Sequence, residues 1–193
     1  MTQWLNQSDM TKVITRSFMP FPILSTSRLM LRQLLLNDEH EIFNLRSDIE
    51  INRYLGRQLS KTLEDARNFI TKINENTNKN DSLYWAITLV NTGKLIGTVC
   101  LFDFSDENCT CELGYELLKN YQGRGIMKEA VEKVIDYAFK TINVQKIKAF
   151  PHRNNQRSIN LLEKLCFKRS NDPEKIHDEL IGYNLIHPGD NSE

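Results

Sequence analysis

The chain has 193 residues, of which 40% are hydrophobic and 26% are charged, and its 25 basic side chains balance its 25 acidic ones. This composition predicts one globular domain with a full core. Because the formal net charge is zero, we expect neither a nucleic-acid partner nor an anionic membrane partner. No apolar run reaches the roughly 20 residues that cross a bilayer, and residues 1–22 lack the apolar core of a secretion signal, which predicts a cytoplasmic protein.

The four cysteines, Cys100, Cys109, Cys111 and Cys166, show no C-x-x-C spacing. Three of them fall in predicted strands, so we expect buried free thiols. Cys109 and Cys111 share one face of a strand, but no histidine is near them in the sequence. We therefore predict no metal site.

Three parts of the chain are distinguished: an arm at 1–22, a domain at 23–187 and a tail at 188–193. The arm ends in Phe18-Met19-Pro20-Phe21-Pro22, a run that disfavours regular structure. A strand is predicted at 29–32, followed by a helix that Asp38 caps. A second helix begins at Thr62, with Asp65 as its capping partner. The apolar residues expected inside these two helices are Ile42, Phe43, Leu45, Ala66, Phe69, Ile70 and Ile73.

The middle of the chain predicts an antiparallel meander. The Asn-rich stretch 74–82 is expected to be a loop, and strands are expected at 84–90, 95–104 and 109–118. The predicted mixed α/β order is completed by a strand at 144–150, a helix at 155–165 and two closing strands around the acidic turn 172–178. In the 155–165 helix, Ile159, Leu162 and Cys166 are expected to face inward.

The helix that starts at Ile126 has two adjacent apolar rows, which together form one wide stripe. The rows are Ile126, Ala130, Val134, Ala138 and Met127, Val131, Ile135, Phe139. This helix is therefore expected to pack on a sheet, with Glu129 and Lys133 paired on its solvent face.

Just before this helix lies Gln122-Gly123-Arg124-Gly125-Ile126-Met127, which predicts a phosphate-binding loop. Glycines let the main chain approach an anion, and the first-turn amides with the helix dipole supply donors. A Walker loop is excluded because no Gly-Lys-Ser/Thr follows, and Lys128 stands where a dinucleotide fingerprint needs its third glycine. On this segment alone, a simple tight turn between strand and helix stays an equal alternative.

The similarity of a longer stretch of the chain to a known family favours the phosphate-binding loop over the simple turn. The residues Glu112-Leu113-Gly114-Tyr115 and Gln122 to Ala130 resemble the acetyl-CoA signature of the GNAT acetyltransferases, in particular the RimJ/RimL-like branch that acetylates ribosomal-protein N-termini. Further matches are at 26–32, 155–158 and 161–167. Two positions depart from the pattern: Met127 replaces a small residue, and Cys166 stands where a glycine is usual.

The resemblance implies an α/β (α+β) single-domain fold with a mixed, mostly antiparallel sheet of about seven strands flanked by helices. The sheet is expected to splay where strand 109–118 parts from strand 144–150, and the glycine loop to wrap the pyrophosphate of acetyl-CoA. An unpaired main-chain amide near Leu117 or Leu118 is expected to stabilise the oxyanion. The implied coenzyme contacts are Leu117, Leu118, Gln122, Gly123, Arg124, Gly125, Ile126, Met127, Lys128, Asn155 and Ser158.

Two residues are the catalytic candidates. Glu112 shares a strand face with Gly114 and Glu116, where a carboxylate is costly unless it is used or paired, so it is either a water-mediated general base or a partner of a cross-sheet cation. The resemblance implies that Ser158 hydrogen-bonds the leaving thiolate, although by position alone it is an ordinary first-turn serine. His152 is a weaker candidate for the base.

Tyr54, Trp85 and Phe102 are candidates for the acceptor pocket, with ordinary core aromatics as the alternative. The predicted function is acetyl transfer from acetyl-CoA to a primary amine, first of all a protein N-terminal α-amine, directly in a ternary complex. The alternatives are acetylation of a polyamine or aminoglycoside, or a catalytically inactive CoA-binding regulatory module. A homodimer stays open.

Overall fold

The computed structural model describes residues 16–170 and 179–189. Its strands are β1 (Leu24–Ser25), β2 (Leu29–Gln33), β3 (Leu83–Leu89), β4 (Leu95–Ser105), β5 (Thr110–Leu117), β6 (Lys146–Ala149), β7 (Lys168–Arg169) and β8 (Tyr183–Ile186). Its α-helices are α1 (Glu39–Ser47), α2 (Ile49–Asn52), α3 (Leu63–Asn78), α4 (Ile126–Tyr137) and α5 (Gln156–Lys164). Short helical turns at Leu36–Asp38, Lys119–Tyr121 and Ala138–Ile142 join them.

The strands form one eight-stranded sheet in the order β1-β2-β3-β4-β5-β6-β8-β7. Every pairing is antiparallel except β5 with β6, which run parallel at Thr110–Lys146, Cys111–Ile147 and Glu112–Lys148. Beyond Glu112 this ladder stops and the two strands diverge. The predicted fold class is therefore confirmed.

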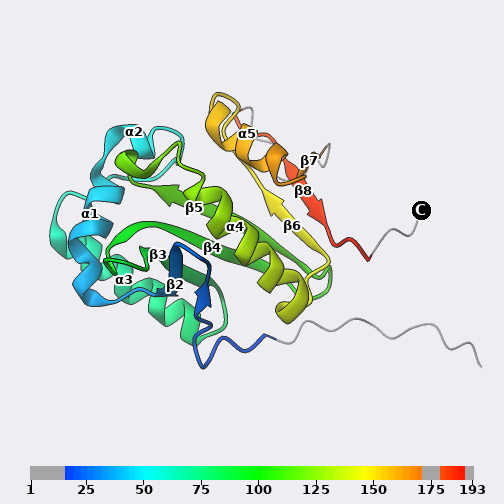
Figure 1. Cartoon of the computed structure of the whole chain (residues 1–193), viewed down its shortest axis with the longest axis horizontal. Helices are drawn as coiled ribbons and strands as arrows, with labels where there is room; N and C mark the ends of the chain where they lie inside the picture. Colours follow the sequence, from blue (N-terminus) through cyan, green and yellow to red (C-terminus); the bar gives the residue numbers. More distant parts are fainter. Residues whose placement is uncertain (1–15, 171–178, 190–193) are drawn as a thin grey trace, which may run out of the picture.

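Two apolar cores cover the two faces of the sheet. One joins the sheet to α4 and α5, and the other joins Ala86 and Leu95 of the sheet to α1 and α3. Figure 1 shows α4 running across the strands, with α1 and α3 gathered at the end of the molecule away from α5. The apolar stripe predicted on α4 is buried apart from Ile135, which is half-buried.

Helix α3 is longer than the sequence predicted. The capping box is present, because Asp65 N donates to Thr62 Oγ1 at 3.1 Å and Thr62 N donates to Asp65 Oδ2 at 2.9 Å. The predicted loop at 74–82 is wrong for its first half, since α3 runs to Asn78. Asn74 Nδ2 donates to Leu34 O and Thr77 is fully buried, so tertiary contacts outweigh the weak helix propensity of these residues.

Two further local predictions need correction. Asp38 does occupy the N-cap position of α1, but its carboxylate accepts from both Nη atoms of Arg32 and from Leu35 N instead of capping that helix. Cys166 is exposed rather than inward-facing, because the chain there adopts a left-handed conformation with φ 65°. Helix α5 ends at Lys164, and two residues later a cysteine adopts the conformation that glycine prefers, at the position where the predicted pattern has glycine.

Packing begins before the predicted domain boundary at residue 23. Phe18 is 1% exposed, and its N–H donates to Asn80 Oδ1 at 2.7 Å. The carbonyl of Pro22 accepts from Trp85 Nε1, also at 2.7 Å. The predicted acidic turn at 172–178 lies outside the described residues. Within the described part of the chain, no helix combines the length and apolarity needed to span a membrane.

Candidate active site

The glycine loop has the backbone geometry of an anion site. Gly123 and Gly125 have φ values of 75° and 72°, and Gly125 is the N-cap of α4. A Cβ at Gly123 would meet nothing within 4 Å, and one at Gly125 would meet only Arg28 Nη2, at 3.8 Å. The loop is thus open on the side where the amides at the start of α4 emerge. Met127 is 8% exposed and packs into the core, so the larger side chain leaves that space clear.

Residues from the start of the domain hold this loop in place, which the sequence did not reveal. Arg28 Nε donates to Glu129 Oε2 at 2.6 Å and Arg28 Nη1 to the carbonyl of Arg124 at 3.2 Å. Thr26 Oγ1 donates to Glu129 Oε1 at 2.5 Å. Partial burial opposes ionisation, but these hydrogen bonds outweigh it and lower the pKa of Glu129. The predicted pairing of Glu129 with Lys133 is wrong, because the carboxylate anchors the β1–β2 turn.

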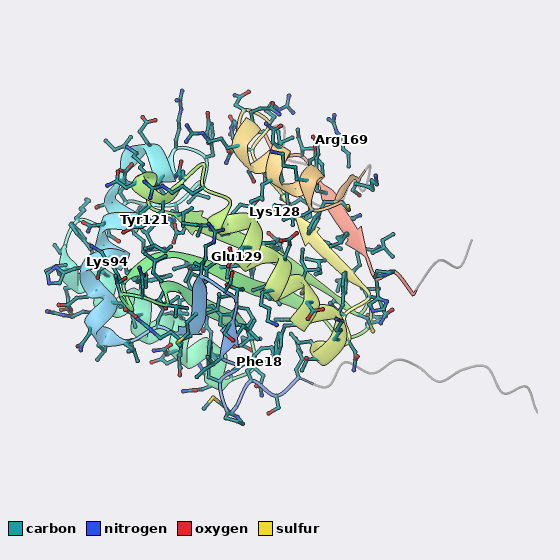
Figure 2. The ribbon with its side chains drawn as sticks, viewed as in Figure 1. Phe18, Lys94, Tyr121, Lys128, Glu129 and Arg169 are labelled. Atoms are coloured by element: carbon teal, nitrogen blue, oxygen red, sulfur yellow. The ribbon has the colours of Figure 1, made fainter. Side chains whose placement is uncertain are left out.

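The cations predicted near phosphate have protein partners. Lys128 Nζ lies 2.6 Å from Glu132 Oε1, one turn along α4, and Figure 2 shows Lys128 and Glu129 at the start of that helix. The guanidinium of Arg124 lies over the ring of Tyr121, 5.9 Å from its centroid. The loop therefore offers main-chain donors first and side-chain charge second.

Where β5 and β6 diverge, one of the two main-chain amides predicted to stabilise the oxyanion is excluded from that role, because it is already hydrogen-bonded. Leu118 N donates to Ile96 O at 2.9 Å, so this amide belongs to the β4–β5 ladder. Because an antiparallel ladder alternates, the N–H of Leu117 points away from β4, into the splay. Gln122 Nε2 donates to Leu117 O at 2.9 Å, and Arg157 Nη1 donates to Gln122 Oε1 at 2.5 Å. Loop, strand end and α5 are thereby linked around the gap.

Ser158 lies at the start of α5 and faces β5. Asn155 Oδ1 accepts from Ser158 N at 3.2 Å and caps the helix. The Ser158 Oγ lies 2.8 Å from the hydroxyl of Tyr115, which spans the splay from β5. Burial raises the pKa of Tyr115 to about 12, although the Ser158 hydrogen bond opposes this. From the sequence, Tyr115 had no role of its own, because its partner is 43 positions away.

Glu112 lies where the parallel ladder ends. It is half-buried, with Phe102 as its register partner in β4 and Lys148 as its register partner in β6. Alternation along β5 puts Glu112 on the sheet face of α1 and α3, opposite to Tyr115. The structure thus places the two catalytic candidates on opposite sides of the splay.

A buried carboxylate that sequence reasoning left without a role lies four residues further along β5. Glu116 is 7% exposed, pairs with Arg57 and accepts from the hydroxyls of Tyr84 and Thr98, each at 3.2 Å. Burial, and then the charge of Glu116, raise the pKa of Tyr84 well above its ordinary value. The argument that a glutamate in a core strand must be paired applies to Glu116, but its partner Arg57 is 59 positions away.

The three aromatic residues that were predicted to line the acceptor pocket lie in different parts of the structure. Trp85 is fully buried against Phe21 and Tyr137, so its assignment to an acceptor pocket is wrong. Phe102 stays beside Glu112. Tyr54, which follows α2, stacks on His152, which follows β6, with the ring centroids 4.9 Å apart. The α2–α3 connection therefore meets the end of β6 beside the splay.

Comparisons with known proteins identify the family. The family model for the acetyltransferase (GNAT) domain matches residues 28–168. The chain belongs to the GNAT acetyltransferase family. An uncharacterized N-acetyltransferase, p20 of Bacillus licheniformis, is 35% identical over 162 residues, which cover 82% of this chain and 90% of p20.

Two more distant GNAT proteins add to this. The [ribosomal protein uS5]-alanine N-acetyltransferase of Escherichia coli is 26% identical over 165 residues, covering 80% of this chain and 82% of that protein. The solved structure of the microcin C7 self-immunity acetyltransferase MccE, in complex with acetyl-CoA and AMP, superposes with a TM-score of 0.71 at 19% identity, covering 84% of this chain and 94% of that one.

As a GNAT enzyme, the protein uses acetyl-CoA and transfers its acetyl group to an amine. The open, left-handed glycine loop at the start of α4 fits the pyrophosphate of that coenzyme. The residues that would hold it are the main chain of 123–128, with Gln122 and Arg157 alongside.

Proposed function

We propose that this GNAT enzyme acetylates the α-amine of a protein N-terminus by direct transfer in a ternary complex. One observation carries the mechanism: Glu112 lies on one side of the β5–β6 splay, and the hydrogen-bonded pair Tyr115–Ser158 lies on the other. This arrangement on opposite faces of β5 supports Glu112 as the proton acceptor and Ser158 as the hydrogen-bond donor. The similarity to the uS5-alanine N-acetyltransferase supports the choice of acceptor.

Each residue has one task. Acetyl-CoA supplies the activated thioester. Glu112 accepts a proton from the acceptor amine through one water, which leaves the nitrogen lone pair free to attack the carbonyl carbon. The N–H of Leu117 donates to the carbonyl oxygen as negative charge develops there. Ser158 donates a hydrogen bond to the departing thiolate, which takes up the second proton that the amine nitrogen loses on becoming an amide. Tyr115 holds the Ser158 hydroxyl in place.

The type of amine follows from this chemistry. An α-amine has a pKa of about 8 and a lysine amine about 10.4, so near neutral pH the α-amine loses its proton far more easily. A carboxylate that works through water is therefore better matched to a chain terminus than to a lysine side chain.

Coenzyme binding is tested with two isosteric variants of the loop. Gly125→Asn and Gly125→Asp add the same bulk at a left-handed position that both residues tolerate, but only Asp adds negative charge. Calorimetry with acetyl-CoA should show Gly125→Asp binding more weakly than Gly125→Asn by a factor of about ten or more. Equal affinities, or no binding by the unmodified protein at millimolar acetyl-CoA, would remove the loop from the proposal.

Catalysis is tested by thiol release with peptides, polyamines and aminoglycosides as acceptors. Glu112→Gln should lower kcat by about a hundredfold, while the affinity for acetyl-CoA stays unchanged. Turnover of polyamines or aminoglycosides alone would favour the small-amine alternative. Coenzyme binding without any turnover would favour the inactive module.

A further inference from the structure

On the sheet face of α1 and α3, two arginines lie near the buried carboxylate of Glu116, and one of them forms an ion pair with it. Arg57 pairs with Glu116 and also donates from Nε to Asn52 Oδ1 at 2.6 Å. Arg46 comes from the last turn of α1, and its guanidinium carbon lies 3.8 Å from the centroid of the Phe69 ring. The charges of Arg57 and Glu116 both act on Arg46. This cluster therefore holds two cations and one anion.

Arg46 has no carboxylate partner of its own among the described residues. Its Nε is buried without a hydrogen-bond partner, and among the described residues no carboxylate forms an ion pair with it. Burial, and then the charge of Arg57, lower the pKa of Arg46, yet a guanidinium stays protonated in proteins. Glu116, which could compensate it, is already engaged by Arg57, Tyr84 and Thr98. Arg46 is thus held by Phe69 as a half-buried cation that lacks an oxyanion.

The position of this cation relates it to the acceptor. Glu112 and Glu116 lie on the same face of β5, four residues apart, which corresponds to roughly 13 Å along a strand. The Tyr115–Ser158 pair occupies the other face, so the proposed mechanism brings the acceptor amine to Glu112 from the face that carries Arg46. A molecule whose amine meets Glu112 and which extends along β5 toward Glu116 would approach the arginine cluster.

We propose that Arg46, supported by Arg57, forms an acceptor subsite for a carboxylate, so that the enzyme prefers amines that carry a carboxylate within roughly 13 Å of the reacting nitrogen. The planar guanidinium fork matches a carboxylate in shape and charge. At about 3.3 Å per residue, this range includes an acidic side chain at the third or fourth residue of an extended peptide. The carboxylate of a small ω-amino acid offers the same group. This inference rests on the proposed direction of acceptor entry.

The test compares acceptors that differ only in that group. Peptides with N-terminal Ser and either Asp or Asn at position 3 or 4 cover the first source, and 6-aminohexanoate with its amide covers the second. For the unmodified enzyme, kcat/KM should favour one of the acidic forms about tenfold to a hundredfold, mostly through KM. In Arg46→Gln this ratio should fall to about one, and Arg46→Lys should retain part of it. The matched control Arg67→Gln removes a paired surface cation of α3 and should keep the full preference.

Two separate measurements keep the outcomes distinct. The affinity for acetyl-CoA, measured by calorimetry, should be the same in Arg46→Gln as in the unmodified enzyme. If neither protein bound acetyl-CoA, that result would contradict the proposed function rather than the subsite. With CoA bound, glutarate should give a heat of association that Arg46→Gln abolishes, which tests the subsite even without turnover. Equal turnover of acidic and amide acceptors, an Arg46→Gln ratio that does not change, or no glutarate binding would overturn the subsite.

Discussion

The hydrogen bond between Tyr115 and Ser158 is the contact on which the leaving-group chemistry depends. Tyr115→Phe removes the hydroxyl and keeps the ring, so Ser158 loses the partner that fixes its rotamer. We expect kcat to fall about threefold to tenfold, which corresponds to one net hydrogen bond, while the affinity for acetyl-CoA stays unchanged. Steady-state thiol release measures this effect.

The matched control for this prediction is the double variant. If Tyr115 acts through Ser158, adding Tyr115→Phe to Ser158→Ala should cause no further loss of kcat. Two independent losses that multiply would instead show that Tyr115 contributes by another route. Because burial raises the pKa of Tyr115 to about 12, its ionisation should be absent from the pH–rate profile up to about pH 10.

A residue of the site could be predicted from the sequence where its role depends on its own residue type and not on a distant partner. Gly123 and Gly125 were found because only glycine adopts their backbone conformation without cost. Tyr115, Arg28 and Arg46 had no such signal, because each acquires its role from a partner far away in the sequence. Ser158 was found through family resemblance, since by itself it is an ordinary first-turn serine.

At the scale of elements, local rules worked where the partners are neighbours in the chain. The Thr62–Asp65 capping box follows from spacing alone and is present. Thr62→Ala removes one of its two hydrogen bonds and should cost about 1 kcal/mol of unfolding free energy, or about 2–4 °C in Tm. Calorimetric melting measures this, with Lys72→Ala on the exposed face of α3 as a control that should change Tm by less than about 1 °C. Equal shifts in the two variants would contradict the capping contribution.

The ion pair between Arg28 in the β1–β2 turn and Glu129 in α4 gives a second prediction at this scale. Glu129→Gln leaves Arg28 charged but weakens the anchor that holds it at the glycine loop. We expect the Kd for acetyl-CoA to rise about threefold to tenfold, because the loop is less well ordered before binding. Calorimetry checks this.

Two variants accompany that measurement. Lys140→Gln breaks the ion pair with Asp136 at the far end of the same helix and should leave the Kd unchanged. Arg28→Met removes the anchor together with its charge. If Glu129→Gln behaves like the unmodified protein while Arg28→Met weakens binding, Arg28 acts on the phosphates directly and not through the loop.

At the scale of the whole molecule, the buried thiols tie stability to alkaline pH. Burial raises the pKa of Cys111, which is 1% exposed, far above its value in the unfolded chain, about 8.5. The stability that this provides is complete below that unfolded pKa and is lost as the pH rises above it, because only the unfolded thiol ionises.

The resulting prediction concerns a slope. Between about pH 9 and pH 11, Cys111→Ala should reduce the decline of unfolding free energy by about 1.4 kcal/mol per pH unit, which corresponds to one proton. Denaturant titrations at several pH values measure it. Cys166→Ala removes an exposed thiol and should leave the slope as in the unmodified protein. An unchanged slope in Cys111→Ala would contradict the assignment of this thiol.

The sequence by itself determined the alternation of the strands, the apolar stripe of α4, the capping of α3 and the glycine loop, because each depends on residues within about one turn or one strand pair of each other. Only the tertiary structure decided that α3 continues through its Asn-rich end and that Trp85 belongs to the core. It also decided that the amide of Leu118 is already hydrogen-bonded. Finally, it showed that Glu129 and Glu116 are paired with arginines. Those outcomes depend on contacts between segments that are distant in the chain. Burial sets the free energy of such contacts, and burial does not exist until the sheet has assembled.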